Sequence, residues 1–257
     1  MSASPLLQTA LAAAKAAEGV IRRCYGSGLA VQTKADRSPV TEADIESERV
    51  IREILARAFP AHGFYGEELG RSAADAEYVW LIDPIDGTKS FVRGYPMFST
   101  QIALLHRGEL VLGVSNAPCY GDGGELAWAE RGQGAFLNGA PIRVSDVGAL
   151  AQATLSLGNI GTLAQSPRWA RLGRLIPQLH RVRGYGDFLH YHLLASGRLD
   201  IVIESDVNIL DIAALTVILR EAGGEITDLD GRPVGLDTTS VFASNGRLKD
   251  AVRAVLG

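Results

Sequence analysis

The chain has 257 residues, of which 47% are hydrophobic and 21% are charged, and its formal net charge at pH 7 is -4. This length fits one large domain or two small ones, and the composition is that of an ordinary globular protein. The negative charge argues against nucleic acid as a partner, and no apolar run is long enough to span a membrane.

The N-terminal segment lacks the basic start and long apolar core of a signal peptide. It predicts an Ala-rich helix over residues 4–25, with Ser4 as the N-cap and Pro5 at the first helical position. Cys24 and Cys119 are far apart in the sequence and neither demand nor exclude a disulfide. Reduced thiols in a cytoplasmic protein are the simpler interpretation.

A second helix is predicted from Thr41 to about Phe59. Thr41 followed three residues later by Asp44 has the layout of a capping box, although Asp is shorter than the usual Glu or Gln. The polar segment before this helix contains Lys34.

The stretch from Trp80 to Phe91 carries the most chemical information. It begins as an apolar strand and then places two carboxylates, Asp83 and Asp86, around Pro84, which we expect to end the strand. A helix is predicted to open near Thr88. Carboxylates suit a hard cation such as Mg²⁺, and a helix N-terminus suits phosphate. Taken alone, the motif is also explained as an acidic turn after a core strand.

The rest of the chain predicts two halves packed as one unit, residues 1–145 and residues 146–257, with ligands at their junction. Turn residues and short apolar runs indicate a largely antiparallel sheet in the first half. Its predicted strands are residues 64–65, 99–105, 110–116, 125–129 and 135–137. Strands and helices alternate after Ala153, which indicates an α/β half. The strands there are 154–157, 181–183, 200–204, 225–227 and 240–243, and the helices are 167–179, 188–196, 209–222 and 247–256.

Three motifs together resemble the inositol monophosphatase superfamily, whose members are Mg²⁺-dependent, lithium-sensitive phosphatases of small molecules. The motifs are Gly66-Glu67-Glu68, Asp83-Pro-Ile-Asp-Gly-Thr88 and Leu210-Asp211-Ile-Ala-Ala214, which stand in the family's order and spacing. The resemblance covers essentially the whole chain. It implies an α+β fold, built as the layered α-β-α-β-α sandwich of the inositol monophosphatase and fructose-1,6-bisphosphatase type, and a homodimer.

The resemblance also implies two or three Mg²⁺ ions in each active site. Glu67, Asp83 and the carbonyl of Ile85 hold the first ion in the family, and Asp83, Asp86 and Asp211 hold the second. A weaker third ion lies near Glu67 through waters. In isolation, Glu67 or Asp211 is more simply explained as a solvated acid at a helix end. The apolar neighbours of Asp211 favour a binding partner for its carboxylate.

By the same resemblance, the Thr88 hydroxyl positions the attacking water, and Asp44 forms a hydrogen bond to Thr88. A capping role explains Asp44 equally well, and the two roles are compatible. Glu67 is the third predicted catalytic residue, and the backbone N–H groups of Gly87 and Thr88 are expected to bind phosphate. Lys34 matches a family lysine that supports metal and water near the site, with an exposed lysine as the alternative.

Substrate choice is predicted to depend on the second half. The stretch Arg183-Gly-Tyr-Gly-Asp-Phe188 stands where inositol phosphatases generally carry Gly-Thr/Ser-Ala-Ala, so Asp187 replaces a small residue. Glu204 matches a family residue that contacts the substrate alcohol. Two acids suit a cationic substrate, and with Asn208 before Asp211 the pattern looks like the histidinol-phosphate phosphatase branch. Asp187 as a helix cap is the alternative. The predicted substrate-contacting residues are Asp86, Gly87, Thr88, Asp187, Glu204 and Asp211, with Lys34 and Asn208 in support.

These observations predict a Mg²⁺-dependent phosphatase that converts histidinol phosphate and water to histidinol and phosphate, in histidine biosynthesis, by in-line attack of a metal-activated water. An inositol-1-monophosphatase or a broad sugar-phosphate phosphatase of the same family is the close alternative. A nucleotide 3'-phosphatase is disfavoured because no adenine-binding signature is present. A regulatory metal-binding protein without catalysis would not need Thr88 and Asp44.

Overall fold

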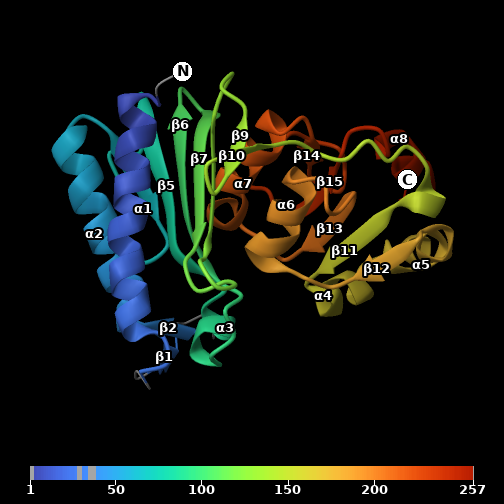
Figure 1. Cartoon of the computed structure of the whole chain (residues 1–257), viewed down its shortest axis with the longest axis horizontal. Helices are drawn as coiled ribbons and strands as arrows, with labels where there is room; N and C mark the ends of the chain where they lie inside the picture. Colours follow the sequence, from blue (N-terminus) through green and yellow to red (C-terminus); the bar gives the residue numbers. More distant parts are fainter. Residues whose placement is uncertain (1–2, 28–30, 34–38, 257) are drawn as a thin grey trace.

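The computed structural model describes residues 3–27, 31–33 and 39–256. Two β-sheets stand side by side and alternate with three layers of helices, as Figure 1 shows. The order is α-β-α-β-α, which confirms the predicted α+β sandwich.

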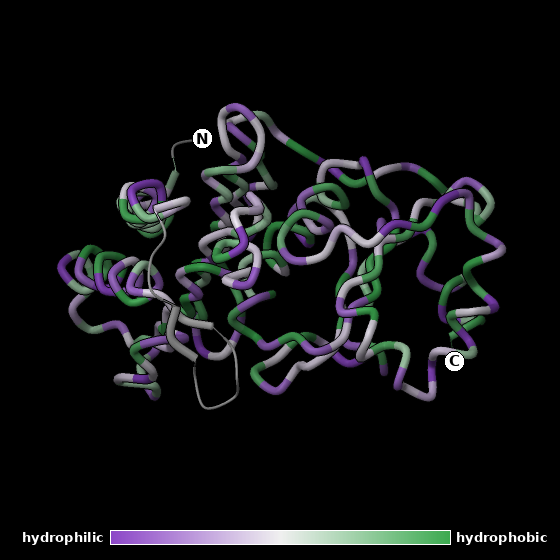
Figure 2. Tube along the Cα trace, turned by 90° about the horizontal axis from the view of Figure 1, so that it is seen from below, coloured by the Kyte–Doolittle hydropathy of each residue, from purple (hydrophilic) through white to green (hydrophobic). Residues whose placement is uncertain are grey.

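The first layer consists of two helices, α1 (Pro5–Cys24) and α2 (Glu42–Ala58). The predicted N-cap of α1 is confirmed, because the Ser4 hydroxyl accepts the N–H of Leu7 at 3.1 Å. Alanines form much of the buried face of α1, so this helix approaches its neighbours closely. In Figure 2 both helices carry hydrophilic as well as hydrophobic residues, as expected of helices that cover a sheet with one face.

The large sheet has the strand order β10-β9-β8-β7-β6-β5-β3-β4. All neighbours in it are antiparallel except β3 and β5, which are parallel. The largely antiparallel sheet predicted for the first half is therefore present, with β4 and β10 as strands that the sequence did not indicate. The bounds are β3 (Gly63–Gly66), β4 (Gly70–Ser72), β5 (Tyr78–Asp86), β6 (Ser99–His106), β7 (Glu109–Ala117), β8 (Glu125–Glu130), β9 (Ala135–Leu137) and β10 (Ala140–Ile142).

The prediction that Pro84 ends its strand is wrong, because β5 continues through it to Asp86. Asp83 pairs with Gln101 and Asp86 pairs with Ser99, so β5 uses three residue steps where β6 uses two. One extra residue of this kind is a β-bulge, and proline is tolerated there because no ladder hydrogen bond is required from its nitrogen.

The bulge decides where the two aspartates lie. Residues three apart in a regular strand point to opposite faces of the sheet. The extra residue in β5 cancels this alternation and lets Asp83 and Asp86 reach the same side. The backbone of the bulge is fixed by the Thr100 hydroxyl, which donates to the carbonyl of Pro84 at 2.8 Å.

The small sheet has the order β12-β11-β13-β15-β14, with β12, β11 and β13 parallel and the remaining pairs antiparallel. Its strands are β11 (Thr154–Gly158), β12 (Arg181–Arg183), β13 (Ile201–Ser205), β14 (Glu225–Thr227) and β15 (Ser240–Ser244). Its outer helices are α4 (Ile160–Gln165), α5 (Trp169–Leu175) and α8 (Lys249–Leu256), with short 3-10 turns at Leu150–Gln152 and Ile176–Gln178. A separate pair is formed by β1 (Val31–Thr33) and β2 (Pro39–Thr41), and α3 (Thr88–Val92) follows β5.

Helices α6 (Asp187–Ala195) and α7 (Ile209–Glu221) fill the layer between the sheets (Figure 1). Helix α7 is apolar on nearly all sides because it packs between two sheets. Its backbone lies so close to β7 that a Cβ atom at Gly113 would lie 2.3 Å from the carbonyl oxygen of Ala214.

Helix α7 of the second half packs against β6 and β7 of the first, so the two halves share one core. The division at residues 145 and 146 therefore stays a proposal. Within the described ranges, no helix is long and apolar enough to cross a membrane.

Candidate active site

Three carboxylates meet where β5 ends and α7 begins. One oxygen from each of Asp83, Asp86 and Asp211 lies within 4.8 Å of the other two. The pocket around them has a volume of about 320 Å³ and is also lined by Glu67 and Thr88. The structure thus brings together five predicted site residues that are spread over most of the sequence.

Local hydrogen bonds fix the first of these carboxylates. Asp83 is buried, and its Oδ1 accepts the backbone N–H of Ile85 at 3.0 Å. The carbonyl of Ile85 lines the same pocket and accepts the Thr88 hydroxyl at 3.0 Å. The bulge, the predicted carbonyl ligand and the predicted catalytic hydroxyl are therefore one rigid unit.

Asn208 orients Asp211 at the start of α7. The backbone N–H and the side-chain amide of Asn208 donate to the two oxygens of Asp211 at 2.7 and 2.8 Å. The Asn208 Oδ1 in turn accepts the N–H of Leu210 at 2.7 Å and caps the helix. The predicted supporting position of Asn208 thus has a structural basis.

Asp44 combines the two roles that the sequence left open. Its Oδ2 accepts the backbone N–H and the hydroxyl of Thr41 at 2.7 and 2.6 Å, which is a capping box. Its Oδ1 lies 3.2 Å from the Thr88 hydroxyl. Burial raises the pKa of Asp44, while the hydrogen bonds from Thr41 act in the opposite direction. Asp44 is therefore a helix cap that also touches Thr88.

Gly87 makes the turn into α3 possible. Its φ is 90°, and a Cβ atom there would lie 2.7 Å from the carbonyl oxygen of Met97, so only glycine fits without strain. Gly87 and Thr88 stand at the start of α3, where backbone N–H groups lack a preceding helical turn, and both residues line the same pocket as the acid cluster.

Glu48, which the sequence did not single out, holds the turn that carries Glu67. Glu48 is fully buried in α2, its Oε2 accepts the N–H of Glu68 at 2.7 Å, and Arg52 is paired with its Oε1 at 2.7 Å. A Cβ atom at Gly66 would lie 1.8 Å from Glu48 Oε1. A signal was available, because Glu48 follows Asp44 at the i,i+4 spacing and so shares its buried helix face.

The acid cluster brings negative charges close together, with Asp83 buried and Asp86 and Asp211 half-buried. Burial, followed by the neighbouring carboxylates, raises the pKa values of Asp83 and Asp86 well above the ordinary value for aspartate. The pKa of Asp211 is raised to about 7, again mainly by burial and against the hydrogen bond from Asn208. An all-oxygen donor set of this charge fits a hard cation such as Mg²⁺ or Ca²⁺ better than a soft one.

A small extension of about 40 Å³ continues from the acid cluster and contains both predicted specificity residues, Asp187 and Glu204. Asp86 and Asp211 line it as well, so the two features are contiguous. Burial and then the charge of Glu204 raise the pKa of Asp187 to about 6, against smaller effects of His190 and Lys89. The extension is therefore a second acidic site, in which His190 lies 3.1 Å from the carboxylate of Glu204.

The alternative that Asp187 caps α6 is wrong. Gly186 occupies the N-cap position, Asp187 is itself the first helical residue, and no side chain caps this helix. Asp187 also has a φ of 45°, which is uncommon for a residue other than glycine. Such strain is typical of functional positions.

Asn159 and Asp206 also line both pockets, although the sequence did not single them out. The Asn159 amide donates to the carbonyls of Ser205 and Asp206 at 2.8 and 3.2 Å and so fixes the loop after β13. Their local sequences carry no motif that could have revealed them. Lys34, the predicted supporting lysine, lies outside the described residues.

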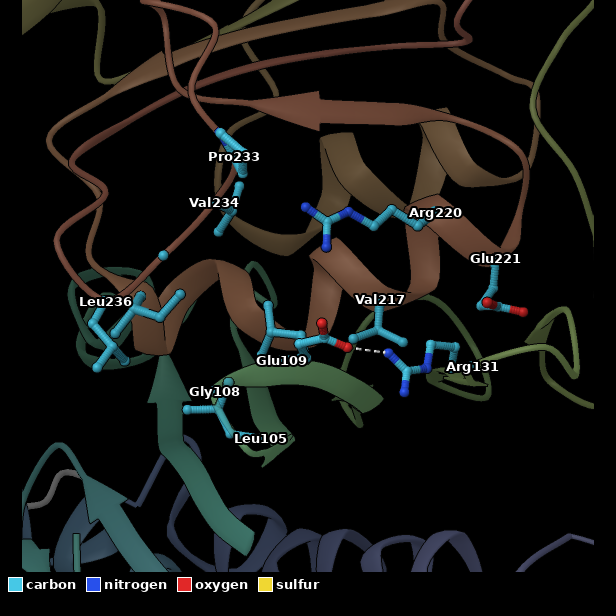
Figure 3. A pocket seen from close by; sticks show the side chains of 13 residues that line it. Leu105, Gly108, Glu109, Arg131, Val217, Arg220, Glu221, Pro233, Val234 and Leu236 are labelled. Carbon is cyan, nitrogen blue, oxygen red and sulfur yellow. Dashed lines mark hydrogen bonds and ion pairs between the residues drawn. The ribbon is translucent and has the colours of Figure 1, made fainter. Parts of the chain in front are cut away.

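Another hollow, of about 380 Å³, lies elsewhere along α7 (Figure 3). Its two acids are already engaged, Glu109 with Arg131 at 2.6 Å and Glu221 with the N–H of Gly132 at 2.9 Å. Its remaining wall is largely apolar, apart from Arg220. The chemistry of a charged substrate and a metal is therefore assigned to the acid cluster, and not to this hollow.

Comparison with known proteins decides the family. The model of the inositol monophosphatase family matches residues 2–256. The chain belongs to this family. It is 42% identical to the histidinol-phosphatase of Mycobacterium tuberculosis, over 96% of this chain and 95% of that protein. It is 36% identical to the histidinol-phosphatase of Chlorobaculum parvum, over 99% and 97% of the two chains.

Other family members are also similar. The inositol-1-monophosphatase of Rhizobium meliloti is 34% identical over 100% of this chain and 97% of that protein. The crystal structure of the extragenic suppressor protein suhB from Bartonella henselae superposes with a TM-score of 0.90 at 30% identity, covering 98% of each chain. The predicted family and fold are confirmed, and the chain is a phosphatase.

Proposed function

We propose that this phosphatase hydrolyses histidinol phosphate to histidinol and phosphate in a Mg²⁺-dependent reaction. The observation that carries the proposal is the acidic pair Asp187 and Glu204, placed directly beside the acid cluster. Higher identity to two proteins named histidinol-phosphatase than to an inositol-1-monophosphatase supports the same choice.

The residues present fit the expected metal ions. Oxygens of three carboxylates converge, and burial together with their mutual repulsion raises the pKa values of Asp83 and Asp86, so a divalent cation would relieve an existing electrostatic cost. Glu67, Asp83 and the Ile85 carbonyl would hold one ion, and Asp83, Asp86 and Asp211 a second, with a third near Glu67. When bound, Mg²⁺ neutralises charge on the phosphate and makes a water molecule more acidic.

Thr88 and Asp44 are assigned to the attacking water. The Thr88 hydroxyl has a single hydrogen, and Asp44 Oδ1 at 3.2 Å and the Ile85 carbonyl at 3.0 Å are its acceptors. The lone pairs of the hydroxyl oxygen are then left to accept a hydrogen bond from water in the pocket. Asp44 acts as a positioning residue because it fixes the Thr88 side chain. Glu67, which lines the same pocket, completes the catalytic set.

The backbone of the α3 turn is assigned to the phosphate. The N–H groups of Gly87 and Thr88 lie at the start of this helix, where the backbone favours anions. Gly87 and Thr88 both line the pocket of the acid cluster, and Met97 and Phe98 pack closely against Gly87 and fix this turn.

The substrate ammonium group is assigned to Asp187 and Glu204. In histidinol phosphate a primary ammonium lies close to the phosphate ester, which matches an acidic extension contiguous with the acid cluster. The charge of Glu204 raises the pKa of Asp187, so a cation between them would remove a repulsion that exists in the free enzyme. A charge-assisted hydrogen bond is worth about 1.5–3 kcal/mol, or roughly ten- to a hundredfold in discrimination.

Inositol-1-phosphate or a broader range of sugar phosphates is the second candidate substrate class. A carboxylate such as Glu204 also accepts hydrogen bonds from hydroxyl groups, and a relative at 34% identity is named an inositol-1-monophosphatase. By family resemblance we also propose a homodimer, and light scattering after size-exclusion chromatography would test this oligomeric state. We propose the cytoplasm as its location.

The test of the proposed function uses enzyme stripped of metal with a chelator and dialysed. Phosphate release from histidinol phosphate should be absent, should return with Mg²⁺, and should not return with NaCl at equal ionic strength. Histidinol should appear in equal amount with phosphate. Full activity without any divalent cation, or no hydrolysis of histidinol phosphate with Mg²⁺, would contradict the proposal.

A further inference from the structure

Glu204 lies in a buried hydrogen-bond network built by helix α6. Its Oε2 accepts the Tyr191 hydroxyl at 2.8 Å and lies 3.1 Å from Nε2 of His190. His190 and Tyr191 are 0% and 2% exposed, and Glu204 is 4% exposed. Two donors on one oxygen compensate this carboxylate for the water that it has lost.

The far side of His190 indicates the direction of these hydrogen bonds. The Ser156 hydroxyl oxygen accepts the backbone N–H of Tyr185 at 3.1 Å and lies 3.4 Å from Nδ1 of His190. With the serine hydrogen directed at Nδ1, the imidazole carries its hydrogen on Nε2 and donates to Glu204. The donors therefore form a chain from the backbone of Tyr185 to Oε2 of Glu204.

The other oxygen of Glu204 is confined by glycine. Gly158 pairs with Glu204 across β11 and β13, and a Cβ atom at Gly158 would lie 2.0 Å from Glu204 Oε1. This carboxylate also lines the extension that contains Asp187. Both oxygens thus have fixed positions before any substrate arrives, which lowers the entropy lost on binding.

We propose that His190 and Tyr191 are positioning residues for substrate specificity. They hold Oε2 of Glu204 and thereby fix its carboxylate for the ammonium group of the substrate, in the extension that also contains Asp187. This inference rests on the proposed function, since it assigns the network to recognition of a cationic phosphate ester. It adds two residues that the sequence did not single out.

The test compares two small esters of equal shape. Phosphoethanolamine carries an ammonium two carbons from the ester oxygen, and propyl phosphate carries a methyl group in the same place. Tyr191→Phe and His190→Leu should lower the preference for phosphoethanolamine about tenfold, through a higher KM, and leave kcat on propyl phosphate unchanged. His190→Gln, whose amide can still donate, should retain most of the preference.

The matched control is Tyr120→Phe. Tyr120 packs against Phe188 of the same helix, with ring centroids 5.7 Å apart, but makes no hydrogen bond to Glu204. Tyr120→Phe should leave the preference for phosphoethanolamine over propyl phosphate unchanged. Thermal melts of all variants identify any general loss of folding.

Failure of the inference and failure of the proposed function give different results. No preference for phosphoethanolamine in the wild type contradicts the proposed function. In that case the positioning claim is tested on the substrate that the wild type hydrolyses with the highest kcat/KM. On that substrate, Tyr191→Phe must change KM in the same direction as Glu204→Gln. The positioning claim would be overturned by equal losses of kcat/KM on both esters or by an unchanged preference in Tyr191→Phe and His190→Leu. A change in KM unlike that of Glu204→Gln would also overturn it.

Discussion

The carboxylate of Glu48 accepts the backbone N–H of Glu68 at 2.7 Å, so helix α2 fixes the turn that carries Glu67. The same helix carries Asp44, which touches Thr88. One helix in the outermost layer therefore orients two parts of the acid-lined pocket. The predicted function depends on this arrangement as much as on the acids themselves.

Glu48→Ala should destabilise the protein and weaken Mg²⁺ activation. The change leaves Arg52 without its buried partner, and breaking such a pair typically costs about 3–5 kcal/mol. Glu53→Ala on the same helix removes an exposed pair with Arg49 and should cost less than about 0.5 kcal/mol. Denaturant unfolding and a Mg²⁺ titration measure both effects. Equal behaviour of the two variants would show that Glu48 does not hold the turn.

Asp83→Asn should abolish nearly all turnover while the fold survives. Asp83 is central to the acid cluster and its charge repels Glu67, Asp86 and Asp211. Removing this repulsion should raise the melting temperature of the metal-free protein. Asp75→Asn, an exposed site, serves as the control and should change neither quantity. Substantial activity of Asp83→Asn at saturating Mg²⁺ would exclude the assigned metal site.

Thr88→Ala should lower kcat about a hundredfold and change KM little, because the hydroxyl acts on the water and not on the ground-state ester. Asp44→Asn should lower kcat in the same direction. The double variant should lose less than the product of the two single losses, since Asp44 acts through Thr88. Variants that change only KM would instead place both residues in substrate binding or structure.

The metal-free protein should lose stability as pH rises from about 4 to 7. Asp83 and Asp86 have raised pKa values and Asp211 has one of about 7, so the folded state binds more protons than the unfolded state in this window. Above it Asp211 is charged and repels the neighbouring carboxylates, and Mg²⁺ should restore stability. Melting temperatures at pH 5 and pH 8, with chelator or Mg²⁺, measure this. The melting temperature of metal-free Asp83→Asn should depend less on pH than that of the wild type. An equal pH dependence would show that the acid cluster is not its cause.

The helices and most strands could be predicted from the sequence because capping residues, turn glycines and apolar periodicity are local signals. The relation of Asp83 to Asp86 could not, because it depends on a bulge that appears only when β5 pairs with β6. For the same reason Pro84 suggested a strand end that the structure does not have.

The roles of the specificity residues could not be settled from the sequence for a similar reason. Asp187 stood at a helix start, where a cap and a binding residue look alike in sequence, and only its position inside the helix separates them. His190 and Tyr191 resembled core residues of an apolar helix. Their contact with Glu204 joins α6 to β13 and cannot be read from either segment alone.

The most direct test of the account is the ratio of kcat/KM for histidinol phosphate to kcat/KM for inositol 1-phosphate, measured in the wild type and in Asp187→Ala. We predict a wild-type ratio well above one and a fall of roughly ten- to a hundredfold in Asp187→Ala, because only the first substrate loses a charge-assisted bond. The melting temperature should change little, since Asp187 does not cap α6. A wild-type ratio at or below one, or a parallel loss on both substrates, would contradict the account.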